Sequence, residues 1–178
     1  MKTKLNILKI TLIALFFVNC SSDDDSNSEN NTVFGTIQLS GTDTSTVGSS
    51  LVVGNIQIDA FATTGTDSSV VLLDENTTVV DGEINPTDFS NAFVIVAAQF
   101  DEDDNAAAEK TISMTILKNG EEFRYVCSTP PLDVTDNTDC GSGFSVDKIE
   151  KRVVFNNTTV INVDSGTILT MDGTIEYN

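Results

Sequence analysis

The densest group of side chains that could do chemistry is acidic. Asp101, Asp103 and Asn105 alternate along the chain, and Glu109 follows Asn105 by four positions. Carboxylate and amide oxygens are the ligands that calcium prefers, and calcium binds about six to eight of them. The sixth and twelfth positions of this segment lack the Gly and Glu that an EF-hand loop requires. Two interpretations therefore remain open, a calcium site in a loop and a solvated acidic turn between two strands.

Most other catalytic chemistry is excluded by composition. The chain has no His, which removes the Ser-His-Asp and Cys-His systems and every His-ligated zinc site. Paired carboxylates of the glycosidase type remain, but no pair stands out and the chain has no Trp for stacking on sugars. Tyr125 and Tyr177 lie in phase with apolar neighbours, so we expect both in the core.

The charge of the chain excludes nucleic acid as a partner. Against 27 Asp and Glu residues stand 9 Lys and Arg residues, for a net charge of -18. Lys148, Lys151 and Arg152 are the only basic residues that lie close together after the N-terminal segment, and Asp147 and Glu150 are interleaved with them. This pattern offers no row of phosphate contacts. An anionic membrane is likewise expected to repel the acidic body of the chain unless divalent cations intervene.

The N-terminus has the pattern of a targeting segment. Lys2, Lys4 and Lys9 precede an apolar run over residues 10–18, and Cys20 follows. That run is too short to cross a bilayer by itself, because a spanning helix needs about 20 apolar residues. The stretch from Leu15 to Asp25, with Cys20 followed by Ser and Asp residues, resembles the signal and surface-export segment of a Bacteroidetes-type lipoprotein. An ordinary secretory signal followed by an acidic tail is the alternative interpretation.

The resemblance implies a lipid-anchored protein. Residues 1–19 would be the signal peptide, Cys20 would carry acyl chains, and residues 20–31 would form an acidic tether. The expected location is the outer membrane, with the protein facing the exterior. Cys127 and Cys140 are then left as a pair in an oxidising compartment, so we expect a disulfide between them.

Residues 32–178 show the alternation of β-strands almost throughout. Asn119-Gly120 predicts a type I′ hairpin between two alternating segments. A continuous apolar run at 91–100 indicates a central strand that is buried on both faces. A long last strand is expected through Asp172-Gly173, with Gly173 at a bulge or a close approach. Further strands are expected at 33–39, 51–61, 70–73, 78–84 and on both sides of a turn at 156–157.

These patterns predict an all-β fold with one domain at 32–178. A β-sandwich is favoured, of immunoglobulin-like type, with a jelly roll or closed barrel as alternatives. The expected function is that of a non-catalytic surface module, which binds a protein or glycan or serves as a structural accessory of the cell envelope. A carboxylate-dependent surface hydrolase is the alternative.

Overall fold

The computed structural model describes residues 33–58, 69–81, 83–100, 107–133 and 136–178. They belong to one compact unit that spans Asn31–Asn178. Within these ranges, no helix has the length and apolar character that crossing a membrane requires.

Almost all of the described chain is extended. The elements, in chain order, are β1 (Gly35–Gly41), α1 (Thr44–Val47), β2 (Ser50–Val53), β3 (Asn55–Ile58), β4 (Ser69–Leu73), β5 (Thr77–Val80), β6 (Glu83–Pro86), β7 (Asn91–Gln99), β8 (Lys110–Lys118), β9 (Glu121–Thr129), β10 (Ser145–Asp147), β11 (Arg152–Asn162) and β12 (Ile168–Glu176). The prediction of an all-β fold is confirmed.

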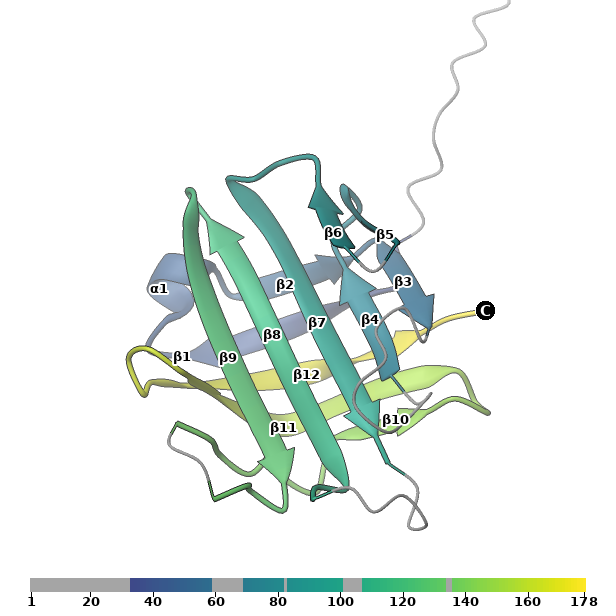
Figure 1. Ribbon diagram of the computed structural model, residues 1–178, viewed down its shortest axis with the longest axis vertical. Coiled ribbons are helices and arrows are strands. Elements are labelled where there is room, and N and C mark those ends of the chain that lie inside the picture. The colour runs from purple at the N-terminus through teal and green to yellow at the C-terminus, as the bar shows by residue number, and fades with distance from the viewer. Residues whose placement is uncertain (1–32, 59–68, 82, 101–106, 134–135) are drawn as a thin grey trace, which may run out of the picture. The chain divides into compact units, whose positions relative to one another are not determined.

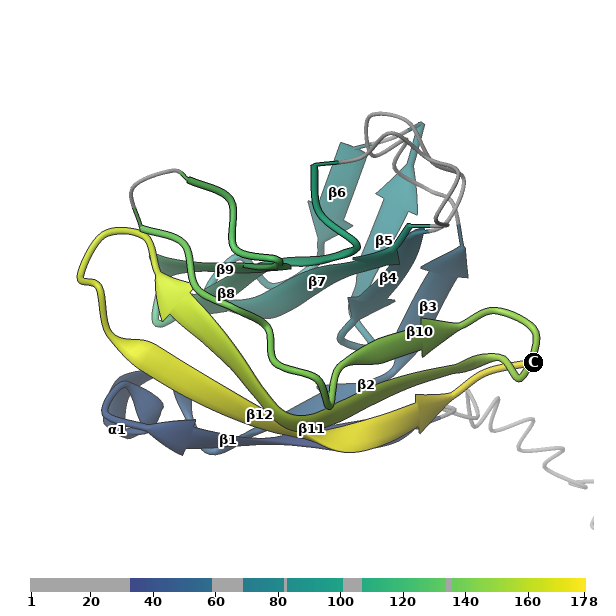
Figure 2. The ribbon, with the colours of Figure 1, turned by 90° about the horizontal axis from the view of Figure 1, so that it is seen from below.

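Ten of the strands form one sheet that folds over into two layers. Its order is β2-β1-β12-β11-β9-β8-β7-β4-β3, and β10 pairs with the other end of β11. Figures 1 and 2 show β9, β8, β7, β4 and β3 in one layer and β2, β1, β12, β11 and β10 in the other. The main hydrophobic core contains residues from both layers. The architecture is thus of the sandwich or barrel type that the sequence predicts.

The strand order differs from the immunoglobulin arrangement. An immunoglobulin sandwich consists of two separate sheets, whereas here the layers are hydrogen-bonded to each other where β9 meets β11. Ile161 pairs with Val126 and Asn162 with Tyr125, and the amide of Val163 donates to the carbonyl of Arg124 at 3.0 Å. One side of the sandwich is closed by these bonds.

The other side is closed by a single passage of the chain. β2 pairs with β1 in one layer, β3 pairs with β4 in the other, and only Gly54 separates them. A Cβ atom at Gly54 would lie 2.5 Å from the Cβ of Glu75, so only glycine fits this crossing. The sequence predicts one strand over 51–61, and the structure corrects this to two short strands in different layers. Residues 59–61 of that prediction lie outside the described residues.

The central apolar strand is buried on both faces, as predicted. Phe93, Ile95 and Ala97 of β7 point into the main core, and Val94 belongs to a second apolar cluster on the opposite face. The hairpin of β5 and β6 covers that outer face, where Val79 packs against the second cluster. This hairpin stands outside the two layers in Figure 2. It buries the second face of the central strands.

That hairpin corrects a further prediction, because residues 78–84 are not one strand. β5 ends before Asp81, whose φ is +53°, and β6 begins at Glu83. Asp-Gly is a preferred hairpin dipeptide because both positions tolerate positive φ. The sequence contains this dipeptide at Asp81-Gly82. The apolar residues on either side of it also fit one continuous strand, so the turn was not predicted.

The expected turn at Asn156-Asn157 is also wrong, because β11 runs straight through it. Phe155 pairs with Gly173 and Thr158 with Met171, so the two asparagines form a β-bulge. Asn157 has a φ of +49°, and its amide donates to the Asp172 carboxylate at 2.8 Å. The Asn pair bends the strand without ending it, since β12 pairs with β11 on both sides of the bulge.

Two other local predictions are confirmed. Asn119 and Gly120 have φ of +53° and +80°, as a type I′ turn requires, and they join β8 to β9. β12 runs through Asp172-Gly173. A Cβ at Gly173 would meet the carbonyl oxygen of Thr36 at 2.7 Å, so this glycine marks the expected close approach.

Candidate binding site

A cavity of about 390 Å³ opens where β2 faces the ends of β7 and β8. Its apolar wall comes from both layers and from the chain just before β1, with Val33, Val47, Leu51, Val52, Phe93, Ile116 and Leu117. Polar groups surround this wall, with Ser50, Asp74, Glu75, Asn76, Asn91 and Lys118. A largely apolar hollow with a few polar groups is the usual composition of a binding pocket. The cavity lies on the side of the sandwich that Gly54 closes.

Asp74 fixes one wall of this cavity. Its Oδ1 accepts a hydrogen bond from the amide of Asn76 at 2.8 Å, which closes the turn after β4. Its Oδ2 accepts from the hydroxyl of Thr77 at 2.7 Å and from the amide of Phe93 in β7 at 3.0 Å. Both carboxylate oxygens are therefore engaged in holding the β4–β5 turn against β7. Asp74 therefore stabilises one wall of the cavity.

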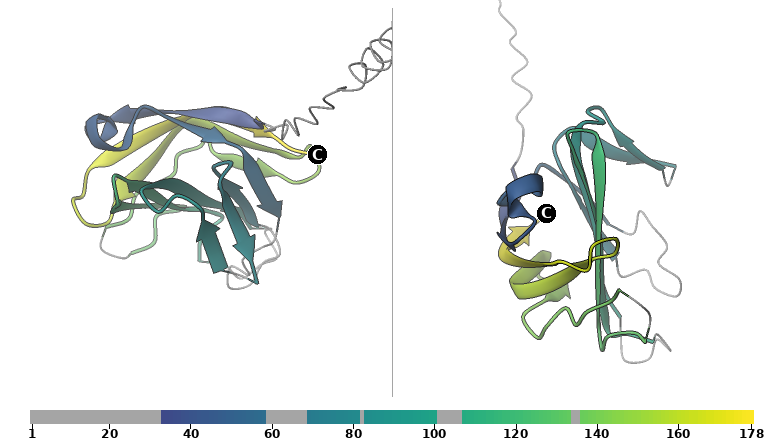
Figure 3. Two further views of the ribbon diagram at one scale, coloured as in Figure 1. Left: turned by 90° about the horizontal axis from the view of Figure 1, so that it is seen from above. Right: turned by 90° about the vertical axis from the view of Figure 1, so that its left-hand side faces the viewer.

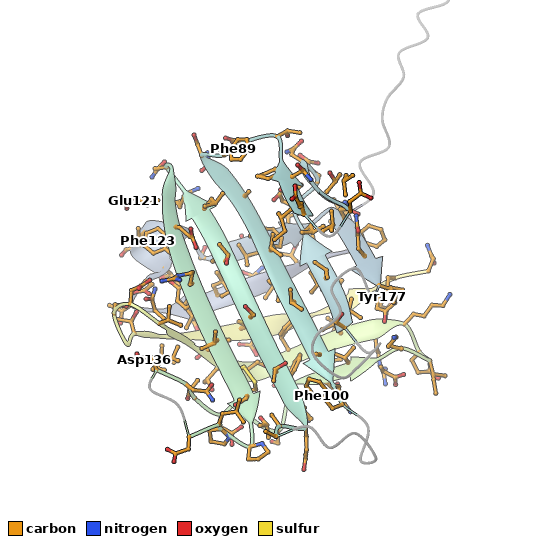
Figure 4. The ribbon with its side chains drawn as sticks, viewed as in Figure 1. Phe89, Phe100, Glu121, Phe123, Asp136 and Tyr177 are labelled. Carbon is orange, nitrogen blue, oxygen red and sulfur yellow. A yellow bond between two sulfur atoms is a disulfide. The ribbon has the colours of Figure 1, made fainter. Side chains whose placement is uncertain are left out.

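A second, smaller hollow of about 250 Å³ lies on the side where β9 pairs with β11. Its lining is Asp43, Thr46, Glu122, Phe123, Asn162, Asp164 and Ser165. Figure 4 shows Phe123 on the opposite side of the sandwich from Tyr177. Three carboxylates line this hollow. Glycosidases act through a pair of carboxyl groups, so these three are candidates for such a pair.

The first of these carboxylates is bound to a buried tyrosine. The hydroxyl of Tyr125 donates to Oδ2 of Asp43 at 2.8 Å, and the hydroxyl of Thr167 donates to the same oxygen at 2.6 Å. Asp43 immediately precedes α1, yet its side chain makes no cap bond to that helix. Burial raises the pKa of Tyr125 well above its usual value, and the hydrogen bond to Asp43 adds to the shift. This group is a structural polar contact inside the sandwich.

The other two carboxylates face one arginine. Nη2 of Arg124 lies 3.1 Å from Oδ1 of Asp164, and its Nε lies 3.8 Å from Oε1 of Glu122. All three side chains are about half exposed, so each ion pair contributes little to stability. Both carboxylates of this pair are therefore engaged by the same guanidinium group.

Two carboxyl groups outside both hollows have altered pKa values. The pKa of Asp139 is lowered by a hydrogen bond from the hydroxyl of Thr129 and one from the amide of Gly141. The pKa of Asp88 is lowered mainly by the amide of Ser90. Both shifts favour the charged form, and both groups stabilise local turns.

The predicted disulfide is present. Cys127 in β9 is joined to Cys140, with 5.0 Å between their Cα atoms. The loop between them is also held by Ser128, whose hydroxyl oxygen accepts from the amide of Leu132 at 2.9 Å and from the side chain of Asn137 at 2.7 Å. Tyr125 and Tyr177 are buried, as expected.

The calcium prediction falls largely outside the described residues, because Asp101, Asp103 and Asn105 all lie there. Glu109 is described and is exposed. Its amide donates to the carbonyl of Thr129 at 2.7 Å just before β8. Among the described residues, no group of three or more potential metal ligands comes together. Cys20 also lies outside the described residues, so its lipidation stays a prediction.

Sequence reasoning missed Asp43, Asp74 and the role of the Tyr125 hydroxyl. Asp74 carried a signal, since an Asp that opens a polar turn commonly binds the backbone two residues on. The sequence contains no signal for the contact between Tyr125 and Asp43, because 82 positions separate the two residues.

Comparison of this chain with protein-family models, curated proteins and solved structures finds no match. A function must accordingly be inferred from the cavity and its surroundings.

Proposed function

We propose that this protein is a non-catalytic surface lipoprotein that binds a partner in the 390 Å³ cavity beside β2. The carrying observation is the composition of that cavity, an apolar wall shared by both layers with polar groups around it. Its ligand is best matched by an apolar side chain or short extended segment of a protein. A glycan is less well matched, because Phe93 is the only aromatic residue among the described residues of the lining, and it is buried in the core.

The edge of β2 supports the same proposal. The carbonyl oxygen of Val53 accepts a hydrogen bond from the amide of Phe34, just before β1. The carbonyl oxygen of Ser49 accepts one from the amide of Leu39 in β1. Backbone groups alternate in direction along an antiparallel strand, so those of Ser50 and Val52 point away from β1. Both residues line the cavity. An extended segment of a partner would find backbone hydrogen bonds along this edge and an apolar hollow for one of its side chains.

The carboxylates of the cavity favour binding over hydrolysis. Asp74 is engaged by three hydrogen bonds, so it is held as a structural group. A glycosidase would need two available carboxyl groups roughly 5 to 10 Å apart. Glu75 also lines this cavity, but its neighbour Asp74 is occupied. Turnover of a glycan or peptide by the purified protein, with loss of that activity on changing one carboxylate, would contradict the non-catalytic proposal.

Site-specific cross-linking tests the binding site. A photoreactive residue in place of Val52, at the cavity, is compared with one in place of Ser113, an exposed residue of β8. On intact cells, we expect a discrete cross-linked product from position 52 alone. The substitution Ile116→Phe should abolish it, because Ile116 of β8 faces the core and lines the cavity. Equal yields from both positions, or a product that persists with Ile116→Phe, would contradict the proposed site.

The lipid anchor has its own test. We expect Cys20→Ser to move the protein from the membrane fraction to the soluble fraction, because one or more acyl chains on Cys20 would be lost. Cys127→Ser/Cys140→Ser serves as the control that leaves the anchor in place. Membrane partition of the Cys20→Ser variant would contradict acylation at this residue.

A further inference from the structure

The turn between β10 and β11 holds the most exposed large apolar side chain among the described residues. Ile149 is 91% exposed, although Val146 and Val153 on the strands beside it are buried. The turn is nevertheless well fixed. Oδ1 of Asp147 accepts hydrogen bonds from the amides of Ile149 at 3.1 Å and Glu150 at 2.8 Å. Single exposed apolar side chains are common on protein surfaces, so the significance of Ile149 depends on the residues around it.

The same turn concentrates positive charge. Residues 147–152 contain Lys148, Lys151 and Arg152, which are half of the six basic residues after Cys20. Of the two carboxylates in the turn, Asp147 is drawn into the turn itself by the bonds above and lies 3.9 Å from Arg152. The other carboxylate, Glu150, is exposed, and residues 147–152 together carry a net charge of +1 in a chain whose net charge is -18. This turn therefore repels an anionic partner less than the acidic chain as a whole does.

The β10–β11 turn and the start of β1 lie at the same end of their layer. Arg152 pairs with Glu176, and the amide of Tyr177 donates to the carbonyl of Lys151 at 2.9 Å. Gly35, at the start of β1, lies against Ile175 of β12. Figure 3 shows the C-terminus close to the start of β1. The described chain thus begins at the end of this layer that carries Ile149.

We infer that the β10–β11 turn docks on the anionic lipid bilayer that holds the chain's own anchor, with Ile149 at the boundary of headgroups and acyl chains. This inference rests on the proposed lipid anchor. Residues 21–31 span at most about 40 Å, which keeps this end of the molecule within reach of the headgroups. Lys148, Lys151 and Arg152 would face the lipid phosphates, as basic residues do around an inserted apolar side chain. The β11–β12 turn would then point away from the membrane.

Tryptophan fluorescence tests this orientation, because the chain contains no Trp. Ile149→Trp places the reporter in the turn. Ile168→Trp is the matched control, since Ile168 is 40% exposed at the start of β12. The nine residues of β12, a length of about 26 Å, separate this position from the Glu176 end.

The test uses the chain from Cys20 onward, which contains the whole described core. Cys20 is its one cysteine outside the disulfide, so it can be coupled to a maleimide lipid. The vesicles consist of phosphatidylcholine and phosphatidylglycerol, and phosphatidylcholine alone is the uncharged comparison. Because the coupling is chemical, the results do not depend on acylation in cells, which the Cys20→Ser fractionation tests separately.

We expect the emission of the Ile149→Trp protein to shift to shorter wavelength and to be quenched by brominated lipids on the order of twofold or more. The emission of the Ile168→Trp protein should stay unchanged. Adding Lys148→Glu/Lys151→Glu should reverse the effect in the Ile149→Trp protein, whereas adding Lys118→Glu, at the cavity, should not. Equal behaviour of the two reporter proteins, or no response to the double Glu substitution, would overturn the inference.

Discussion

The two sides of the sandwich are closed in different ways. Where β9 meets β11, backbone hydrogen bonds, the Cys127–Cys140 disulfide and the contact between Tyr125 and Asp43 join the layers. Where β2 leads into β3, the chain crosses at Gly54. The hollow beside the first closure is lined mainly by polar residues, and its carboxylates are engaged, whereas the cavity beside the second has an apolar wall. The side with fewer ties between the layers is thus the one with more room for a ligand.

The largest effect is expected from the disulfide. Cys127→Ser/Cys140→Ser should lower the free energy of unfolding by about 3 kcal/mol, because opening a loop of this length restores chain entropy to the unfolded state. Urea unfolding followed by circular dichroism measures the change. A difference below about 1 kcal/mol would show that the backbone pairing of β9 with β11 holds this side without covalent help.

Gly54→Ala should cost about 1 to 3 kcal/mol, because the new methyl group would meet the backbone of Glu75. The same urea titration measures it, and Ser50→Ala, an exposed change in β2, is the control. We expect the cavity to change shape as well, since Glu75 lines it. A neutral effect on both stability and cross-linking from position 52 would mean that the crossing tolerates displacement.

Tyr125→Phe should cost about 1 kcal/mol at neutral pH, the usual value of one buried hydrogen bond. The wild-type protein should also lose stability at alkaline pH. The pKa of Tyr125 is raised in the folded state, so its contribution is fully present below about pH 10 and is lost as the pH rises beyond it. Thermal unfolding between neutral and alkaline pH measures both effects. A wild-type slope that Tyr125→Phe leaves unchanged would assign the alkaline loss to other groups.

The smallest stability effect is expected from Ile116→Phe, below about 1 kcal/mol, because the larger side chain can extend into the cavity that Ile116 lines. Its effect on binding should be large, with loss of the cross-linked product at position 52. Ser113→Phe is the control for adding a ring to an exposed position of β8 without touching the cavity. A strong destabilisation by Ile116→Phe would show that the cavity is smaller than its geometry indicates.

Much of the strand pattern could be predicted from the sequence, and two of the errors share one cause. The β8–β9 hairpin and the apolar β7 were predicted because each depends on neighbouring residues alone. The turn expected at Asn156-Asn157 and the single strand expected over 51–61 were wrong because the outcome depends on a distant partner. β12 pairs with β11 on both sides of its bulge, and β3 pairs with β4 in the other layer.

The all-β fold, the buried tyrosines and the disulfide pair follow from the sequence, because strand alternation and cysteine pairing are read along the chain. Three features follow only from the folded structure: where the sheet folds over, which residues line the cavity and which group meets the Tyr125 hydroxyl. These depend on strands that are distant in sequence and adjacent in space, as β1 is to β12. Backbone hydrogen bonds are alike for every pair of strands, so the complementarity of the whole core selects the partners.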